Sequence, residues 1–522
     1  MIDLSKATTL ADVARAQADA RPTEIAFVKE GAATSFADFD ARASRIAQRL
    51  LAAGLQPNDR IAILSKNTDA FYEILFGSAK ARTALAPVNF RLAAPEIAYI
   101  LKDAGARFLF VGVDFIDLAE KALADMADKP VLVALDEPRE GYETYVRWRD
   151  GLATRDPMLK AAPDDDVLQL YTSGTTGLPK GVQLTNANYH AFLSLARSVE
   201  GFNYQAGERV LNAMPQFHVA GANIGIIAVS TGSTTTILKD LIPAVTLDLI
   251  ERHKINHAFF VPAVIMMLLQ APEMANADLS SLKTVAYGAS PIAEELLVKA
   301  QARFGCRFLQ LYGMTETVGA ATFLPPEAHD PAKGKLRSCG LAWPGIDVEI
   351  VDADGKALPP GEVGEIVIRA PVVMKGYWNK PEATAETIRD GWLRTGDAAY
   401  KDADGYFFIY DRVKDMIVTG GENVYPAEVE NAIFGHPDVA DVAVIGVPDE
   451  KWGEAVKAVI VAKPGCTIDP AAIIAHARER IANYKVPKTI DVVETIPRNP
   501  SGKILRRELR KPYWEGRERQ VG

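Results

Sequence analysis

Residues 171–182 read YTSGTTGLPKGV, a run in which hydroxyl side chains alternate with glycines and a lysine stands near the end. Glycine lets the backbone turn tightly and bring its N–H groups close to an anion. The hydroxyls add further donors, and the lysine adds a full positive charge. The run therefore predicts a loop that binds a polyphosphate. Its expected ligand-binding residues are Thr172, Ser173, Gly174, Thr175, Thr176, Gly177 and Lys180.

The sequence on either side of this loop indicates what it connects. Residues 167–171 (VLQLY) and 181–185 (GVQLT) each predict a strand, and Thr185 suits the N-cap of a following helix. In a Walker A motif the lysine opens a helix, whereas Lys180 is followed by a strand. A run of Gly, Ser and Thr is usually a flexible linker, but two flanking strands hold this one within a fold.

Size, charge and cysteine usage narrow the class of protein. The chain has 522 residues, too many for one core, so two or more domains are expected. Its net charge of −9 and the absence of a long basic run argue against a nucleic-acid partner. Cys306, Cys339 and Cys466 lie far apart without metal-ligand spacing, which fits a reducing cytosol. We therefore expect a cytoplasmic protein.

Two features bear on membranes. Residues 1–22 lack the apolar stretch of a secretory signal, and residues 10–20 predict an amphipathic helix instead. No run of about 18 apolar residues occurs, so we expect no transmembrane helix. Net charge does not decide whether the protein contacts a membrane surface, so both a peripheral membrane protein and one without membrane contact fit the sequence.

The first 160 residues alternate between helical and strand patterns. Residues 36–54 predict a helix that ends at a glycine, 59–67 a strand, 68–84 a second helix and 108–112 a buried strand. The same alternation returns between residues 208 and 311, where strands end at TVAYGAS and FLQLYG. This pattern is typical of a layered α/β fold.

Beyond residue 337 the pattern changes. Short strands separated by Asp-Gly and Pro-Gly turns predict an antiparallel β unit over residues 337–410. The last 110 residues or so predict a smaller unit with strands around a helix at 471–482. The charged stretch 411–415 (DRVKD) separates the two, so we expect a large domain over 1–411 and a small one over 412–522.

Two further segments carry polar side chains that suit a nucleotide. In YGMTET (312–317), Tyr312 offers an aromatic face to a purine and Thr315 a hydroxyl to a phosphate. Glu316 offers hard oxygen ligands to Mg²⁺ beside a triphosphate. Asp397, in RTGD, can accept hydrogen bonds from both hydroxyls of a ribose. With the phosphate loop, these residues predict an ATP site.

These segments occur in an order that resembles the acyl- and aryl-adenylating enzymes, namely acyl-CoA synthetases, adenylation domains of peptide synthetases and firefly luciferase. The resemblance extends over nearly the whole chain, to PRNPSGKILRREL at 497–509. KDMIVTG (414–420), GGENVYPAEVE (420–430) and the chain length look most like fatty-acid and arylpropenoate CoA ligases. The resemblance implies an α/β fold: a large N-terminal domain of layered α/β subdomains plus a β subdomain, and a small mobile α+β C-terminal domain.

The resemblance also implies a role for each matching residue. Catalysis of adenylation falls to Lys503, with Thr315, Glu316 and His218 beside the reacting groups, and Glu316 as the metal ligand. Lys414 is the expected hinge of the small domain. Gly420 and Gly421 leave room for the pantetheine arm of CoA. The remaining nucleotide-binding residues are Gly288, Ala289, Tyr312 and Gly313 for the base, and Asp397 and Arg412 for the ribose.

The leading interpretation is an AMP-forming acyl-CoA synthetase, an acid–thiol ligase that uses ATP, Mg²⁺ and CoA. The acyl pocket is expected near 218–227 and 287–291, where Ala220, Gly221, Ala222 and Gly225 would leave volume for an acyl chain or a ring. We favour medium- or long-chain fatty acids, with cinnamate- or ferulate-type acids next. A stand-alone enzyme that loads a carrier protein, a luciferase-type oxygenase and a non-catalytic nucleotide binder are the alternatives. Either a monomer or a homodimer is expected.

Overall fold

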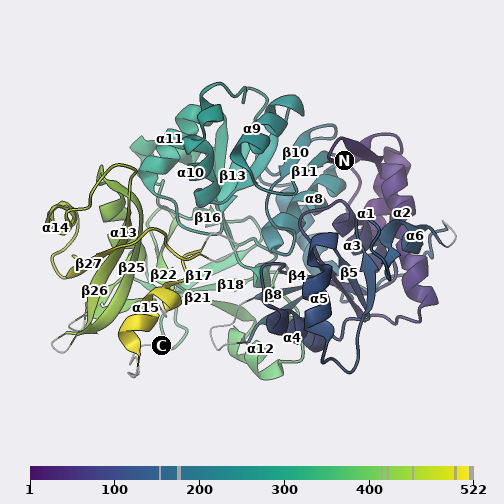
Figure 1. Ribbon diagram of the computed structural model, residues 1–522. Helices are drawn as coiled ribbons and strands as arrows, with labels where there is room; N and C mark the ends of the chain where they lie inside the picture. The colour runs from purple at the N-terminus through teal and green to yellow at the C-terminus, as the bar shows by residue number, and fades with distance from the viewer. Residues whose placement is uncertain are drawn as a thin grey trace.

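The computed structural model describes residues 1–151, 155–172, 178–412, 415–419, 422–449, 452–498 and 503–515. Within these ranges the strands form four sheets, and helices cover the two largest (Figure 1). No helix in the described part of the chain is long and apolar enough to cross a membrane. Mixed α/β layers followed by a smaller C-terminal unit agree with the expected fold class.

The first large sheet carries the phosphate loop. Its eight strands follow the order β19-β9-β8-β4-β3-β5-β6-β7, and the strands from β8 to β7 run parallel while β9 and β19 are antiparallel to their neighbours. Their bounds are β3 (Arg60–Leu64), β4 (Ala84–Val88), β5 (Phe108–Val111), β6 (Val131–Ala134), β7 (Glu143–Thr144), β8 (Asp166–Thr172), β9 (Lys180–Thr185) and β19 (Gly376–Tyr377).

The second large sheet has nine strands in the order β16-β15-β14-β13-β12-β10-β11-β1-β2. Its five central strands are parallel, so their carboxyl ends meet at one edge, which is where ligands bind in open α/β sheets. The bounds are β1 (Ile25–Lys29), β2 (Ala32–Ser35), β10 (Arg209–Asn212), β11 (Thr234–Ile237), β12 (His257–Phe260), β13 (Thr284–Gly288), β14 (Arg307–Tyr312), β15 (Thr322–Leu324) and β16 (Leu341–Ala342).

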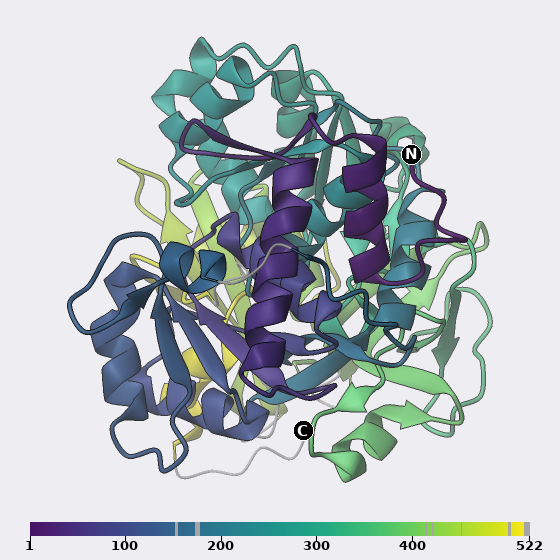
Figure 2. The ribbon, with the colours of Figure 1, turned by 90° about the vertical axis from the view of Figure 1, so that its right-hand side faces the viewer.

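Helices separate and cover these sheets, and Figure 2 shows α1 and α2 lying side by side on the N-terminal face. The helices of the large domain are α1 (Leu10–Ala20), α2 (Phe36–Ala52), α3 (Ala70–Lys80), α4 (Ala94–Ala104), α5 (Ile116–Leu123), α6 (Tyr145–Asp150), α7 (Asn186–Ala196), α8 (Val219–Thr231), α9 (Pro243–Arg252), α10 (Pro262–Gln270), α11 (Glu294–Phe304) and α12 (Pro381–Thr387). Short 3-10 turns occupy Val113–Phe115, Pro272–Ala275, Thr315–Thr317, Pro326–His329 and Pro331–Lys333.

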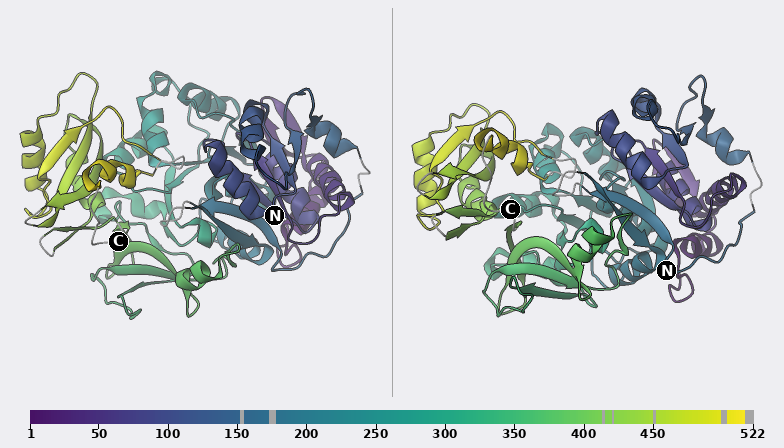
Figure 3. Two further views of the ribbon diagram at one scale, coloured as in Figure 1. Left: turned by 60° about the horizontal axis from the view of Figure 1, so that its bottom comes forward. Right: turned by 90° about the horizontal axis from the view of Figure 1, so that it is seen from below.

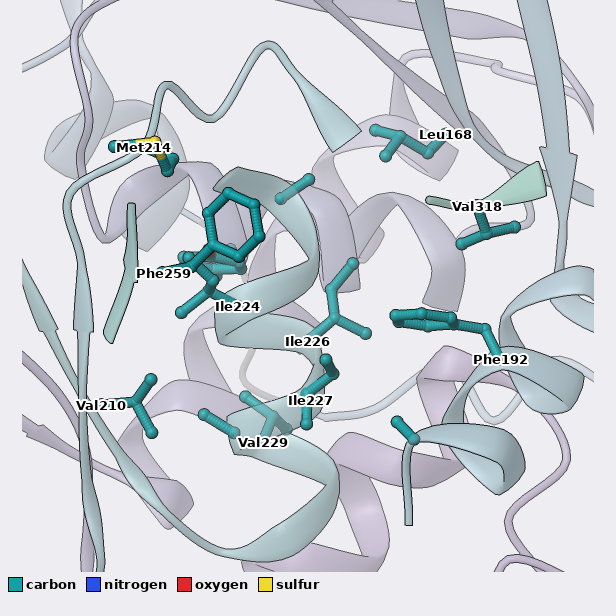
Figure 4. Close-up of a cluster of buried hydrophobic side chains, with 14 of the residues drawn as sticks. Leu168, Phe192, Val210, Met214, Ile224, Ile226, Ile227, Val229, Phe259 and Val318 are labelled. Atoms are coloured by element: carbon teal, nitrogen blue, oxygen red, sulfur yellow. The ribbon is translucent and has the colours of Figure 1, made fainter. Parts of the chain in front are cut away.

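Helix α8 runs through the centre of the main core. Every residue from Gly221 to Thr231 is buried, and Figure 4 shows its isoleucines packed among side chains from several surrounding elements. A helix that is apolar on all sides is stable only inside a protein. Such a segment shows no 3.6-residue alternation, which is why residues 219–231 gave no helical signal in the sequence.

The third sheet is the antiparallel β unit predicted from the turns. Its strands follow the order β17-β18-β21-β20, and β22 pairs with β21. The bounds are β17 (Asp347–Val351), β18 (Gly364–Arg369), β20 (Ile388–Arg389), β21 (Trp392–Lys401) and β22 (Phe407–Arg412).

The fourth sheet forms the core of the small C-terminal unit, which Figure 3 shows at one end of the molecule. Its elements are β23 (Ile417–Thr419), β24 (Glu422–Val424), α13 (Pro426–Phe434), β25 (Val439–Asp449), β26 (Gly453–Ala462), α14 (Pro470–Arg478), β27 (Thr489–Val492) and α15 (Arg506–Trp514). A groove lined by Glu294, Val298, Glu428 and Phe434 separates this unit from α11 of the large domain.

Most predicted elements are present, and two helices end early. The helix expected over 68–84 stops at Lys80, because Arg82 takes a left-handed backbone (φ 62°) and β4 begins at Ala84. The helix expected over 471–482 ends at Arg478. The helix expected after the phosphate loop begins at Asn186, and Thr185 caps it by accepting from the N–H of Asn188.

Candidate active site

The expected ribose-binding corner lies where β14 meets the third sheet. Tyr312 ends β14, and its hydroxyl donates to Oδ2 of Asp397 at 2.7 Å. Burial and the Asp397 carboxylate raise the pKa of Tyr312, so the hydroxyl stays a donor. Asp397 lies on β21 directly opposite Arg412 of β22, so the two residues predicted to bind one ribose are cross-strand partners.

Gly288 and Ala289 form a close-packed backbone wall beside this corner. Gly288 is the last residue of β13, and a Cβ there would stand 2.3 Å from the carbonyl oxygen of Leu311, so glycine is required. Ala289 adopts a left-handed backbone with φ 66°. Tyr287, in contrast, points into the core, where its hydroxyl contacts Nε2 of His329 at 3.1 Å. Only the end of this segment therefore faces the site.

The turn after Tyr312 buries the expected metal ligand. Residues Thr315–Thr317 form one 3-10 turn, and Glu316 is 5% exposed. The Glu316 backbone carbonyl accepts from the N–H of Met374, and its Oε1 accepts from the hydroxyl of Tyr377 at 2.8 Å. A Cβ on Gly313 would stand 2.4 Å from the Gly319 carbonyl, so the turn is closed tightly at its base.

The two ends of the phosphate loop are held next to this turn. Thr172 and Lys180 are register partners across β8 and β9, as the two predicted strands required. Nζ of Lys180 lies 4.7 Å above the centre of the Tyr377 ring, which is a cation–π distance. Tyr377 therefore stands between Lys180 and Glu316 and contacts both.

His218 directly precedes α8 and lies beside an aromatic group. Its ring lies 4.6 Å from that of Phe217, which in turn meets Phe90 edge-on at 5.4 Å. Burial, together with the smaller effect of the positive charges of Arg91 and Lys503, lowers the pKa of His218 to about 4. The imidazole is thus neutral at pH 7. Lys503 is exposed, and it lies near enough for its charge to lower the pKa of His218.

The glycines of α8 do not leave room for an acyl group, contrary to the sequence interpretation. A Cβ on Gly221 would stand 2.1 Å from the Pro215 carbonyl oxygen, and one on Gly225 would stand 2.2 Å from Cζ of Tyr72. The Tyr72 hydroxyl donates to the Gly221 carbonyl at 2.8 Å and accepts from the Gly225 N–H at 3.1 Å. At these two positions only glycine leaves space for the backbone of Pro215 and the side chain of Tyr72.

Several predicted site residues lie outside the described residues: Ser173, Gly174, Thr175, Thr176, Gly177, Lys414, Gly420 and Gly421. For Arg412 only the backbone is described. Conversely, Tyr377 and Asn223 contact site elements and were not predicted. Tyr377 lies in a strand of two residues, and Asn223 in a uniformly apolar segment, so only spatial proximity reveals them.

The sequence profile of AMP-binding enzymes matches residues 14–378, and that of the AMP-binding enzyme C-terminal domain matches residues 428–503. The chain is 42% identical to a fatty acid–[acyl-carrier-protein] ligase of Streptomyces coeruleorubidus, with 98% of each chain covered. It is 39% identical to a feruloyl-CoA synthase of an Amycolatopsis species, covering 92% of this chain and 94% of that one.

Among solved structures, a Mycobacterium tuberculosis fatty acyl CoA synthetase superposes with a TM-score of 0.77 and is 34% identical. The alignment covers 97% of this chain and 99% of the other. The first profile lies in the large unit and the second in the small one, and the structural similarity extends across both.

Proposed function

The chain belongs to the family of AMP-binding enzymes and is an AMP-forming acid–thiol ligase, and on that premise we propose that it activates medium- or long-chain fatty acids. The observation that supports the site assignment best is that predicted residues occur together in three pairs. Tyr312 is hydrogen-bonded to Asp397, and Lys180 and Glu316 both contact Tyr377. The charge of Lys503 lowers the pKa of His218.

The first half-reaction joins the acid to AMP. A carboxylate oxygen attacks the α-phosphorus of ATP, a C–O–P anhydride forms, and pyrophosphate leaves. Lys503 would neutralise the negative charges that meet as this bond forms, and Lys180 would hold the phosphates that depart. Asp397 and Arg412 would fix the ribose, so that the α-phosphate lies in line with the acid.

Mg²⁺ fits the residues present. Glu316 offers hard carboxylate oxygens in a buried turn beside the lysine of the phosphate loop, and one or two carboxylates plus substrate phosphates is how proteins usually hold this ion. Glu316 would hold the ion, and Thr315 would contact a phosphate. When bound, Mg²⁺ neutralises charge on the phosphates. The neutral His218 would line the carboxylate end of the acyl pocket without adding a second cation there.

The second half-reaction transfers the acyl group to CoA. The CoA thiolate attacks the acyl carbon, the C–O bond of the anhydride breaks, and AMP leaves with that oxygen. We propose that the small domain (412–522) turns on the large one (1–411) about Lys414 between the two steps. Lys503 would then leave the centre, while Gly420 and Gly421 would admit the narrow pantetheine arm.

A carrier protein is the second candidate for the acyl acceptor, because one relative at 42% identity is named as an acyl-carrier-protein ligase. Cinnamate- or ferulate-type acids are the second candidate for the substrate, because a relative at 39% identity is named as a feruloyl-CoA synthase. The closed contacts at Gly221 and Gly225 support neither acid over the other. A cytoplasmic location and a monomeric or dimeric state stay predictions.

Pyrophosphate release across a panel of acids tests the proposal. The panel holds C4 to C18 fatty acids and cinnamate- and benzoate-type acids, each with CoA, with a carrier protein or with neither acceptor. The proposal predicts CoA-dependent turnover with C8 to C18 acids. Turnover with cinnamate-type acids alone would mean that these acids, and not fatty acids, are the substrate. Turnover with the carrier protein alone would mean that a carrier protein, and not CoA, is the acceptor. A panel without pyrophosphate release would refute the activity.

A further inference from the structure

Tyr377 is in direct contact with two charged residues that the expected chemistry needs but that carry opposite signs. Its hydroxyl donates to Oε1 of Glu316 at 2.8 Å, and its ring lies beneath Nζ of Lys180 at 4.7 Å. The Tyr377 side chain is 8% exposed, and its hydrogen bond to Glu316 is buried. Within the described residues, no ion pair joins Lys180 directly to Glu316.

The backbone around Tyr377 is anchored to the same two elements. Met374 donates its N–H to the Glu316 carbonyl at 2.8 Å, and Trp378 donates to the Gly181 carbonyl at 2.8 Å. The N–H of Tyr377 donates to Oγ1 of Thr384, in α12, at 2.9 Å. The position of the ring is therefore fixed from three sides: by the metal-ligand turn, by the strand after the phosphate loop and by α12.

The chemistry explains why a neutral aromatic residue suits this place. If Lys180 and Glu316 formed an ion pair, each would neutralise the charge of the other. Neither charge would then be available to bind ATP or Mg²⁺. A phenol can donate one hydrogen bond to a carboxylate while its ring face attracts a cation. Tyr377 can thus hold both side chains in place and leave their charges available to the ligand.

We propose that Tyr377 is a positioning residue that holds Lys180 and Glu316 apart and directs both toward the triphosphate and its metal ion. The inference rests on the proposed function, because the ligand it assigns to the two side chains is ATP with Mg²⁺. It predicts that the Tyr377 hydroxyl matters for binding of the metal–nucleotide complex and for adenylation. Thioester formation from preformed acyl-AMP does not need the triphosphate, so it should not depend on this hydroxyl.

The test uses Tyr377→Phe, which keeps the ring under Lys180 and removes only the hydrogen bond to Glu316. Calorimetric titration with ATP, with and without Mg²⁺, gives a readout that needs no turnover. We expect the Kd of Mg²⁺–ATP to rise about 10-fold, as for a lost hydrogen bond to a charged group, and the Kd of metal-free ATP to change less than 2-fold. Half-maximal ATP–pyrophosphate exchange should need correspondingly more Mg²⁺.

Tyr406→Phe is the matched control, because Nζ of Lys335 lies 4.7 Å above the Tyr406 ring in the same kind of contact elsewhere. It should bind Mg²⁺–ATP like the unmodified protein. Tyr377→Leu removes the ring as well and should weaken metal-free ATP too. Thermal unfolding of each variant checks that it is folded.

Two results would overturn the assignment. Tyr377→Phe with unchanged Mg²⁺ dependence would show that the hydroxyl does not position Glu316. Equal weakening of ATP with and without Mg²⁺, together with equal slowing of both half-reactions, would show a general structural role. Failure of the proposed function would look different, because the unmodified protein would then bind ATP without exchanging pyrophosphate for any acid.

Discussion

Ala289 has a left-handed backbone at the edge of the expected adenine site, with φ 66°. Alanine tolerates this conformation at a small cost, whereas a β-branched residue does not. We expect Ala289→Val to lower the free energy of unfolding by about 2 kcal/mol and to weaken ATP binding. The control is Ala293→Val, where the backbone is extended (φ −69°, ψ 135°) and accepts valine. Urea unfolding measures the free energy of unfolding of both variants. An equal loss in the two would contradict the role assigned to the left-handed backbone at Ala289.

Lys503 carries the most specific prediction at the level of one residue. Lys503→Ala should slow ATP–pyrophosphate exchange by about 100-fold or more, because a charge that stabilises the transition state is lost. Thioester formation from preformed acyl-AMP should persist. Lys511→Ala removes an exposed lysine from α15 in the same C-terminal segment and should leave both rates unchanged. Equal exchange rates in the two variants would exclude Lys503 from adenylation.

At the next scale, helix α8 is tied to the turn that carries Glu316. Nδ2 of Asn223 donates to the Val318 carbonyl at 2.8 Å, and Oδ1 of Asn223 accepts from the Tyr189 hydroxyl at 3.3 Å. Val318 is a β-branched residue with φ 51°, an outlier that the surrounding contacts must hold. Figure 4 shows Val318 facing the apolar side chains beside α8.

Asn223→Ala should therefore affect both stability and catalysis. It leaves a buried carbonyl and a buried hydroxyl without this partner, so the free energy of unfolding should fall by about 1–3 kcal/mol. The turn at 315–318 should loosen, and pyrophosphate exchange should slow at saturating acid. Asn276→Ala, at an exposed position, is the control. Unchanged exchange in Asn223→Ala would mean that α8 does not position the turn.

Elements with local signals were predictable, and elements defined by packing were not. Thr185 and the two strands around the phosphate loop could be predicted from side chains that act on their own backbone. Helix α8 could not, because its apolar residues face other elements on every side. The same reason hid Tyr72, whose fit against Gly225 exists only once α3 and α8 have packed together. Helix α13 was not predicted either, because residues 420–430 were matched as a motif and not examined for a helical pattern.

For the whole molecule, one buried and one half-buried histidine predict loss of stability in acid. His329 contacts the Tyr287 hydroxyl and the Pro325 carbonyl, and burial lowers its pKa from 6.5 to about 4. As the pH falls, the unfolded chain gains a proton on this histidine before the folded chain does. The contribution of His329 to the free energy of unfolding is therefore fully present above pH 6.5 and is lost as the pH falls toward 4. His218 acts in the same direction.

By pH 5 His329 alone should cost about 2 kcal/mol of the free energy of unfolding. Urea unfolding at pH 7.5 and pH 5 measures this loss. His329→Asn should be less stable than the unmodified protein at pH 7.5, but should lose less on acidification. If both proteins lose the same amount, the imidazole of His329 is not responsible for the acid sensitivity.

The architecture of the whole molecule was readable because the motifs that carry the chemistry occur in order along 522 residues. The identity of the acid was not readable, because the space beside a small residue depends on side chains from other elements. Small residues such as Gly221 looked like free volume in the sequence, yet they are filled by neighbouring backbone. A sequence reports which residues are small, but only packing reports what occupies the space beside them.

Transfer of a carboxylate oxygen to AMP tests the central claim most directly. The protein is incubated with ATP, CoA and an acid labelled with ¹⁸O in both carboxylate oxygens, and the nucleotide product is weighed by mass spectrometry. If the acid attacks the α-phosphorus and the thiol then attacks the acyl carbon, each AMP carries one ¹⁸O and the thioester keeps the other. Unlabelled AMP, or ¹⁸O found in inorganic phosphate beside ADP, would contradict an acyl-AMP intermediate and with it the account given for this site.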